Sequence, residues 1–173
     1  LYPDRVRLEE HDGDFDYVYE TQALATLPGN TYHSKKNHIS AFTRQHNWRY
    51  EPLTDMNAAD ALAVSSQWCR EKGSCTDAGL SSEKCAIRRL LEYRETLSVS
   101  GGLVYVDDKP VAFTLGSPIN SDVFDVHVEK ALSAYAGAYA VINREFAKTL
   151  TAYRYLNREN DMGIPGLRRA KQS

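Results

Sequence analysis

The 173-residue sequence has no long hydrophobic run and no strong excess of charge of either sign. No window approaches the roughly 20 consecutive apolar residues that a membrane-spanning helix needs, and residues 1–10 do not resemble a signal peptide. The 21 basic and 23 acidic residues leave a net charge of -2, so binding to nucleic acid or anionic lipid would need a local patch. We therefore expect a cytoplasmic protein without a transmembrane segment, and contact with a membrane surface stays open.

Several familiar catalytic motifs are also missing. There is no GxSxG elbow, no HExxH pair and no GxxxxGKS or GxxxxGKT phosphate loop, so the sequence gives little support to nucleophilic catalysis and none to nucleotide hydrolysis. Cys69, Cys75 and Cys85 form no CxxC pair and have no histidines at metal-ligand spacing. We expect no bound metal and free thiols in a reducing compartment, with a Cys69–Cys75 bridge or a redox role as the alternative.

Helices and strands are expected to alternate along the chain. The expected elements are a helical connector within 21–46, a strand at 50–53, a helix capped by Thr54, a helix opened by Ser81 or Ser82 with Leu97 on its apolar face, strands at 103–106, 111–115 and 123–129, a helix from Gly137, a strand at 153–157 and a helix from Pro165. Asp107 and Asp108 read as a hairpin turn. The order predicts an α/β protein with a mixed sheet, in which a crossover helix and a parallel strand follow an antiparallel meander.

The strand at 123–129 carries the first candidate site. Its alternation puts apolar side chains on one face and Asp125, His127 and Glu129 on the other. The loop that follows leads to a helix at Gly137, whose unpaired N–H groups suit a phosphate or an oxyanion. The alternative is a solvated strand face followed by a glycine that only permits a tight turn.

The second candidate is the polar segment 157–163, which directly follows a strand expected to be central. Ligands of open α/β sheets bind at the carboxyl ends of strands, so Glu159 could act as a general base. The alternative is an acidic turn that caps the following helix.

The third candidate is a basic run in the connector, where Lys35, Lys36 and Arg44 are interleaved with aromatic residues. Such a pattern can neutralise phosphates and stack on bases. The full run comprises His33, Lys35, Lys36, His38, Arg44, His46 and Arg49, with Tyr32, Phe42 and Trp48 between them. A solvated linker face is the alternative.

Five separated segments of the sequence resemble one known family. They are LPGNTYHSKKNHI at 27–39, VAFTLGSPIN at 111–120, VHVEKA at 126–131, GAY at 137–139 with INREF at 142–146, and LNRENDMGIPGLRRAK at 156–171. Together they resemble the bacterial family of unknown function that is homologous to the C-terminal domain of phosphatidylglycerol lysyltransferases. The resemblance implies a GNAT-like (acyl-CoA N-acyltransferase) fold with helices on both faces of the sheet.

Members of that family commonly contain two successive GNAT-like copies. The resemblance therefore implies that residues 1–48 are the end of a preceding copy plus a basic connector. Residues 49–173 would be the C-terminal GNAT-like domain without its last strands. The start at Leu1 and the helical end of the sequence agree with an incomplete chain.

The resemblance also implies where an acyl donor would lie. The backbone of Val126 and Val128 would contact the donor, and the loop at Ala136, Gly137, Ala138 and Tyr139 would hold a pyrophosphate, with Asn157 on the neighbouring strand. This loop departs from the usual Arg/Gln-x-x-Gly-x-Gly/Ala signature. Glu159, Glu129 and His127 are the expected catalytic residues.

The leading hypothesis is an acyl or aminoacyl transferase. The donor would be an acyl-CoA thioester or an aminoacyl-tRNA, and the acceptor an amine or hydroxyl of a small molecule or lipid. The alternative is a non-catalytic binding module that recognises tRNA, a cell-envelope precursor or another protein. The sequence identifies neither the acceptor nor the oligomeric state.

Overall fold

The computed structural model describes residue 7 and residues 9–72 and 78–172. The elements in chain order are a short 3-10 helix (Asp12–Asp14), β1 (Val18–Glu20), α1 (Thr21–Thr26), α2 (His33–Gln45), β2 (Trp48–Pro52), α3 (Ala58–Glu71), α4 (Ala78–Glu92), β3 (Ser100–Val106), β4 (Lys109–Pro118), β5 (Val123–Ala131), α5 (Ala138–Thr149), β6 (Tyr155–Asn157) and α6 (Pro165–Gln172). In the described part of the chain, no helix combines the length and the apolar character that a membrane crossing requires.

The strands form one mixed sheet in the order β1-β6-β5-β4-β3-β2. All neighbouring strands are antiparallel except β5 and β6, which are parallel. Parallel neighbours cannot be joined by a tight turn, so the chain crosses between them through α5. The predicted meander, crossover helix and parallel strand are therefore confirmed.

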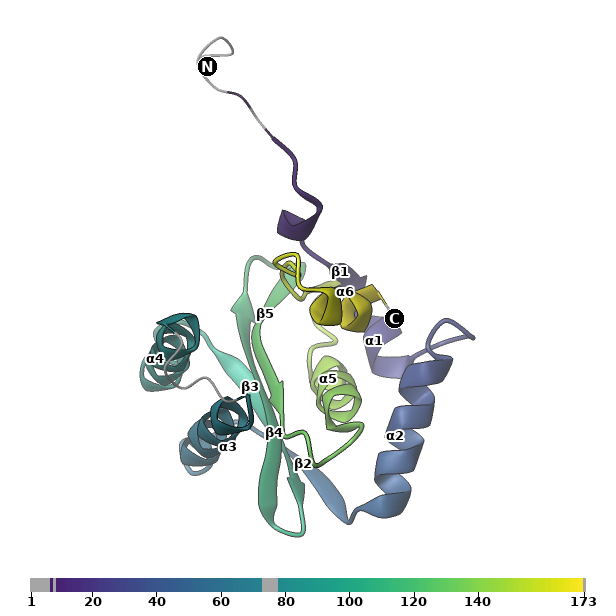
Figure 1. Cartoon of the computed structure of the whole chain (residues 1–173), viewed down its shortest axis with the longest axis vertical. Coiled ribbons are helices and arrows are strands. Elements are labelled where there is room, and N and C mark those ends of the chain that lie inside the picture. Colours follow the sequence, from purple (N-terminus) through teal and green to yellow (C-terminus); the bar gives the residue numbers. More distant parts are fainter. Residues whose placement is uncertain (1–6, 8, 73–77, 173) are drawn as a thin grey trace.

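Helices cover both faces of the sheet (Figure 1). α3 and α4 pack on one face around Phe113 and Leu115, and α1, α2 and α5 pack on the other. Neighbouring residues of β3 enter opposite cores, since Leu103 joins the α3 side and Val104 the α5 side, as the two-residue period of a strand requires. The predicted layering is confirmed.

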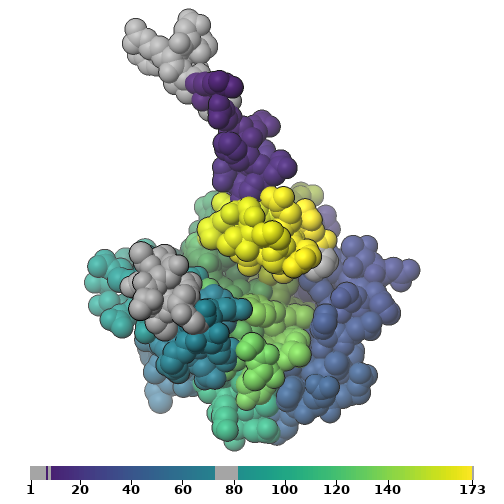
Figure 2. All heavy atoms as spheres, viewed as in Figure 1, coloured from purple at the N-terminus to yellow at the C-terminus, as the bar shows by residue number. Residues whose placement is uncertain are grey.

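The segment before residue 48 packs into the same sheet and cores as the rest. β1 pairs with β6, and Leu24 of α1 and Phe42 of α2 are fully buried. Figure 2 shows α6 (yellow) against the base of the N-terminal segment (purple), where the Tyr17 hydroxyl donates to Asp161 Oδ2 at 2.7 Å. The division at residue 48 stays a prediction.

The hairpin between β3 and β4 forms where its turn residues predict it. Asp107 and Asp108 have φ angles of +48° and +64°, the left-handed conformation that a two-residue hairpin turn requires. Strand β6 is shorter than predicted and begins at Tyr155, while Tyr153 packs against the core beside α5.

Three predicted helix limits are wrong, and one of them is the start of α4, which begins at Ala78 and not at Ser81 or Ser82. α3 begins at Ala58 because the Asn57 side chain closes the preceding turn, where its Oδ1 accepts the Thr54 N–H at 2.8 Å. α4 ends at Glu92, so Leu97 lies beyond it and is 47% exposed.

The cysteines give a partial answer to the thiol prediction. Cys69 is buried in α3 and Cys85 is an exposed free thiol of α4. Cys75 lies outside the described residues, and so does Gly73, the glycine at which the sequence predicts that the helix containing Cys69 ends. The alternative of a bridge therefore stays open.

Strand β5 contains a bulge opposite β4. Leu115 pairs with Val128 and Gly116 with Val126, which leaves His127 without a partner residue in this register. Val126 consequently enters the core on the α5 side, whereas Val128 enters the core on the α3 side. One extra residue in a strand shifts the alternation of all residues beyond it.

The bulge changes the face on which Glu129 lies. Its Oε2 accepts a hydrogen bond from Asn143 Nδ2 of α5 at 3.0 Å, so Glu129 faces α5. The prediction that Glu129 shares a face with Asp125 and His127 is wrong, because the alternation does not continue through the bulge.

Candidate active site

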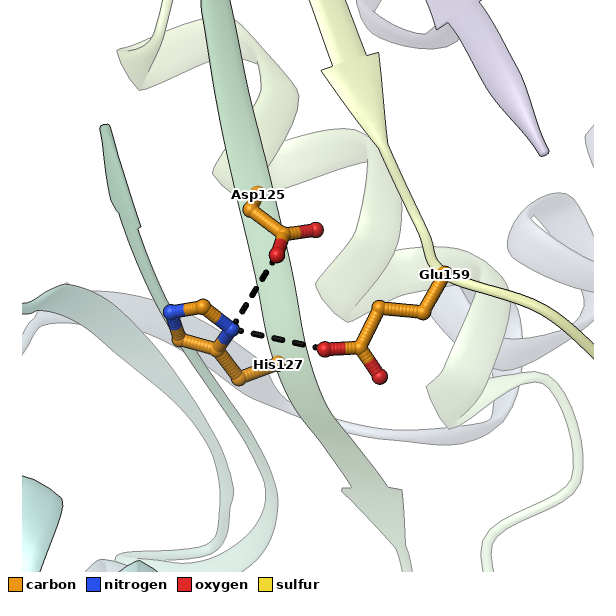
Figure 3. A group of neighbouring side chains, drawn as sticks. All are labelled: Asp125, His127 and Glu159. Carbon is orange, nitrogen blue, oxygen red and sulfur yellow. Dashed lines mark hydrogen bonds and ion pairs between the residues drawn. The ribbon is translucent and has the colours of Figure 1, made fainter. Parts of the chain in front are cut away.

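β5 and β6 are paired along Val123–Asp125 and Tyr155–Asn157; β6 ends there, and the chain that follows it diverges from β5 (Figure 3). Polar side chains gather where they part. Asp125 and His127 extend from β5, and Glu159 extends from the loop after β6, with both carboxylates directed at the same imidazole nitrogen (Figure 3). Two of the predicted catalytic residues, His127 and Glu159, are thus brought together.

Both ring nitrogens of His127 have partners. Nε2 lies 2.8 Å from the Ser117 Oγ at the end of β4, and Nδ1 lies 3.4 Å from Glu159 Oε1 and 3.3 Å from Asp125 Oδ2. With its proton on Nδ1, the ring donates to the carboxylates and Nε2 accepts the Ser117 hydroxyl. The His127 side chain is 26% exposed, so the group is accessible from solvent.

The carboxylates change the acid–base behaviour of the ring. The hydrogen bond to Glu159 raises the pKa of His127, and the charge of Asp125 adds to this effect against the opposing effect of burial. Burial raises the pKa of Asp125, and the neighbouring His127 opposes that shift. Asp125 Oδ1 is buried and has no hydrogen-bond partner among the described residues, so this carboxylate has spare acceptor capacity.

The backbone of Glu159 is held in an unusual conformation. Its φ is +56°, which costs a residue other than glycine on the order of 1–3 kcal/mol. The Asn157 Oδ1 accepts the Glu159 N–H at 2.9 Å, and Lys171 Nζ donates to the carbonyls of Arg158, Glu159 and Asn160. Asn157, predicted to bind a cofactor, thus positions Glu159. Strain that the surrounding structure maintains is typical of functional sites.

Glu129, the third predicted catalytic residue, is not part of this group. Its Oε1 lies 2.8 Å from Arg158 Nη2, and the two side chains are only 11% and 12% exposed. This buried ion pair bridges β5 and the residue after β6 on the α5 side of the sheet. The ion pair also lies near Lys35 of α2, because the charge of Arg158 adds to burial in lowering the pKa of Lys35. A catalytic role for Glu129 stays a prediction.

The loop before α5 packs closely against α2. Gly137 has a φ of +94°, and a Cβ there would lie 2.7 Å from the His38 carbonyl oxygen, so packing alone requires glycine. Of the other predicted donor-binding residues, Ala136 is exposed, Ala138 is fully buried, Tyr139 is 44% exposed, and Val126 and Val128 are buried on opposite faces. Their contact with a donor stays a prediction.

The predicted basic face of the connector is divided in the structure. Lys35 is half-buried, Lys36 donates to the Gly29 carbonyl at 2.8 Å, and Arg44 is exposed. Phe42 is fully buried, so the prediction that it could stack on a base is wrong. Nucleic-acid binding by the three cations stays a prediction.

Ser117 belongs to the site although no sequence pattern pointed to it, and Asp125 was expected only as a neighbour of His127 on one strand face. The predicted strand at 111–115 ends before Ser117, whereas β4 continues to Pro118 and pairs Ser117 with Asp125 of β5. The bulge brings His127 beside Ser117 and Asp125, and the loop after β6 brings Glu159 to His127. No local sequence pattern indicates either the bulge or the course of this loop. Asp125, His127 and Glu159 offer ligand atoms within 4.8 Å of one another, a geometry that could also hold a metal ion.

The mixed sheet, the parallel β5–β6 pair and the crossover helix α5 define a GNAT-like fold. A solved protein of the GNAT acetyltransferase family from Desulfovibrio desulfuricans has this fold, with a TM-score of 0.50, 13% identity, and coverage of 64% of this chain and 71% of its own. The chain belongs to the family described as "Phosphatidylglycerol lysyltransferase, C-terminal", whose model matches residues 2–173.

Two longer solved structures show the same architecture over part of their length. A conserved protein of unknown function from Bacteroides thetaiotaomicron is 40% identical with a TM-score of 0.92, over 98% of this chain and 58% of that protein. L-PGS from Bacillus licheniformis is 11% identical with a TM-score of 0.55, over 88% of this chain and 48% of its own. The chain thus spans about half the length of these two proteins.

Proposed function

We propose that this protein transfers an acyl or aminoacyl group from a CoA thioester or an aminoacyl-tRNA to an amine or hydroxyl acceptor. The observation that carries the proposal is the His127 group at the point where the chain after β6 leaves β5. Family membership supports the proposal, because the description of the family names the C-terminal part of a lysyltransferase. The whole protein's substrates are part of this proposal.

In the proposed reaction His127 is the general base. Its Nε2 takes the proton of the attacking group as the new bond to the carbonyl carbon forms. Glu159 holds the Nδ1 proton and, together with Asp125, stabilises the imidazolium that results. Positioned acid–base catalysis of this kind typically contributes about 10²–10⁴-fold.

The donor is identified by a direct comparison. Lysyl-tRNA and acetyl-CoA, each radiolabelled in the acyl group, are incubated with the full-length protein and with either phosphatidylglycerol vesicles or polylysine as acceptor. The proposal predicts label in an acceptor from one of the two donors. The donor that reacts should also raise the melting temperature, since it binds the native state.

A non-catalytic binding module is the second candidate, and the ion pair between Glu129 and Arg158 favours it. This pair connects the two strands in the region where the donor is expected, so a donor lying between them would have to displace it. Binding of uncharged and charged tRNA with equal affinity, a steep salt dependence and no transfer would support this candidate. Transfer of label from either donor would exclude it.

A further inference from the structure

We propose that Ser117 is a nucleophile that carries the acyl group covalently, so that transfer passes through an acyl-Ser117 ester. The inference rests on the proposed function and deepens it. It assigns a chemical step to a residue that the proposed general-base mechanism leaves without one.

Ser117, His127 and Glu159 form a chain of three groups in the order that activates a serine hydroxyl. The hydroxyl lies 2.8 Å from Nε2, and the opposite ring nitrogen faces Glu159 at 3.4 Å and Asp125 at 3.3 Å. A nucleophile beside a base that a third group orients is the geometric signature of covalent acyl transfer, independent of sequence order.

The backbone around Ser117 fixes this arrangement. The preceding Gly116 is packed so tightly that a Cβ there would lie 2.2 Å from the Asp125 carbonyl oxygen. This close approach of β4 to β5 keeps Ser117 opposite Asp125, and the bulge brings His127 beside it. Ser117 is half-buried and the His127 side chain beside it is 26% exposed, so the pair is not closed off from solvent.

The two half-reactions balance without a further reactant. In the first, Ser117 Oγ attacks the donor carbonyl, His127 Nε2 takes the hydroxyl proton, and the ribose oxygen of tRNA or the sulfur of CoA leaves with that proton. In the second, the acceptor amine or hydroxyl gives its proton to His127 and attacks the ester. Ser117 Oγ then leaves and regains the proton. No electron is gained or lost.

A fluorophosphonate probe tests the nucleophile without any knowledge of the substrate. The full-length protein is treated with a biotinylated fluorophosphonate, and the modified residue is located by peptide mass spectrometry, which requires no variant. We expect one label per chain, on Ser117. His127→Gln should slow labelling by about 10²–10⁴-fold, the contribution of a positioned base.

Serine variants then connect labelling to transfer. Ser117→Ala should abolish labelling and lower transfer at least about 100-fold, while Ser121→Ala, an exposed serine in the turn after β4, should label and transfer like the wild type. Intact mass after a short reaction with the active donor should show an acyl adduct in the wild type that Ser117→Ala lacks.

The outcomes separate the two proposals. Absence of label on Ser117, or wild-type transfer by a folded Ser117→Ala protein, would overturn the covalent step and leave direct transfer with His127 as base. Labelling of Ser117 without transfer from either donor would support the nucleophile and contradict the proposed function.

Discussion

Replacing Arg158 with methionine tests how much the ion pair between Arg158 and Glu129 stabilises the fold where the chain after β6 leaves β5. Methionine approximates the length of the side chain but removes its charge and its hydrogen bond to Glu129. Glu129 is 11% exposed in the wild type, and the substitution leaves it the hydrogen bond from Asn143 Nδ2. The substitution therefore removes the cation that is paired with a buried carboxylate, on which the charges of Lys35 and Lys171 still act.

The expected cost follows from this burial. Removing one member of a buried ion pair typically costs about 3–5 kcal/mol, because the remaining charge is poorly solvated. For a chain of this size that corresponds to a fall of about 6–20 °C in melting temperature. The double variant Glu129→Gln with Arg158→Met removes both charges and keeps an acceptor for Asn143, so it should recover most of the loss.

Urea and thermal unfolding measure these differences. Lys148→Met is a matched control, because Lys148 is 47% exposed and its pair with Glu145 should contribute no more than about 1 kcal/mol. If Arg158→Met were as stable as this control, or if the double variant were no more stable than the single one, the charge would not be buried as the structure implies.

Further predictions concern the site and its surroundings. Glu159→Gln removes the largest cause of the raised pKa of His127, so the rise of transfer rate with pH should move to lower pH in a pH–rate profile. In the wild type, the raised pKa of His127 also stabilises the fold at pH values below the unfolded pKa of histidine, and this stabilisation is lost as pH rises through the folded pKa. In Glu159→Gln this stabilisation should be smaller, and unfolding measured as a function of pH checks it. Gly137→Ala should lower the free energy of unfolding by at least about 1–2 kcal/mol, since φ is +94° and the His38 carbonyl lies 2.7 Å from the new Cβ, and urea unfolding checks this. Dialysis against EDTA should leave fluorophosphonate labelling unchanged, because both nitrogens of His127 are engaged by Ser117 and the carboxylates. A loss of labelling that zinc restores would instead show that Asp125, His127 and Glu159 bind a metal ion.

Much of the fold follows from local signals in the sequence. Asp107 and Asp108 specify the β3–β4 hairpin by themselves, and the crossover from β5 to β6 follows from element order. The start of α3 was mispredicted because Asn57 uses its side chain to close a turn with Thr54. Signals that depend on a distant partner are not visible in a local pattern.

The site shows the same limit more clearly. His127 and Glu159 could be predicted because each lies on or directly after a strand at one edge of the site. Glu129 was placed on the wrong face, because the bulge in β5 arises from its register with β4 and not from its own composition. Ser117 was overlooked for the same reason, since its contact with His127 exists only when that register forms.

The central claim is that His127 acts as the base in acyl transfer, and a single-turnover comparison tests it most directly. Wild-type protein, His127→Gln and the control His11→Gln, an exposed histidine near the N-terminus, are each mixed in excess over labelled lysyl-tRNA or acetyl-CoA with the acceptors named above. The account predicts transfer by the wild type and the control, and a rate about 10²–10⁴-fold lower in a folded His127→Gln protein. Equal rates in all three proteins, or no transfer by the wild type, would contradict it.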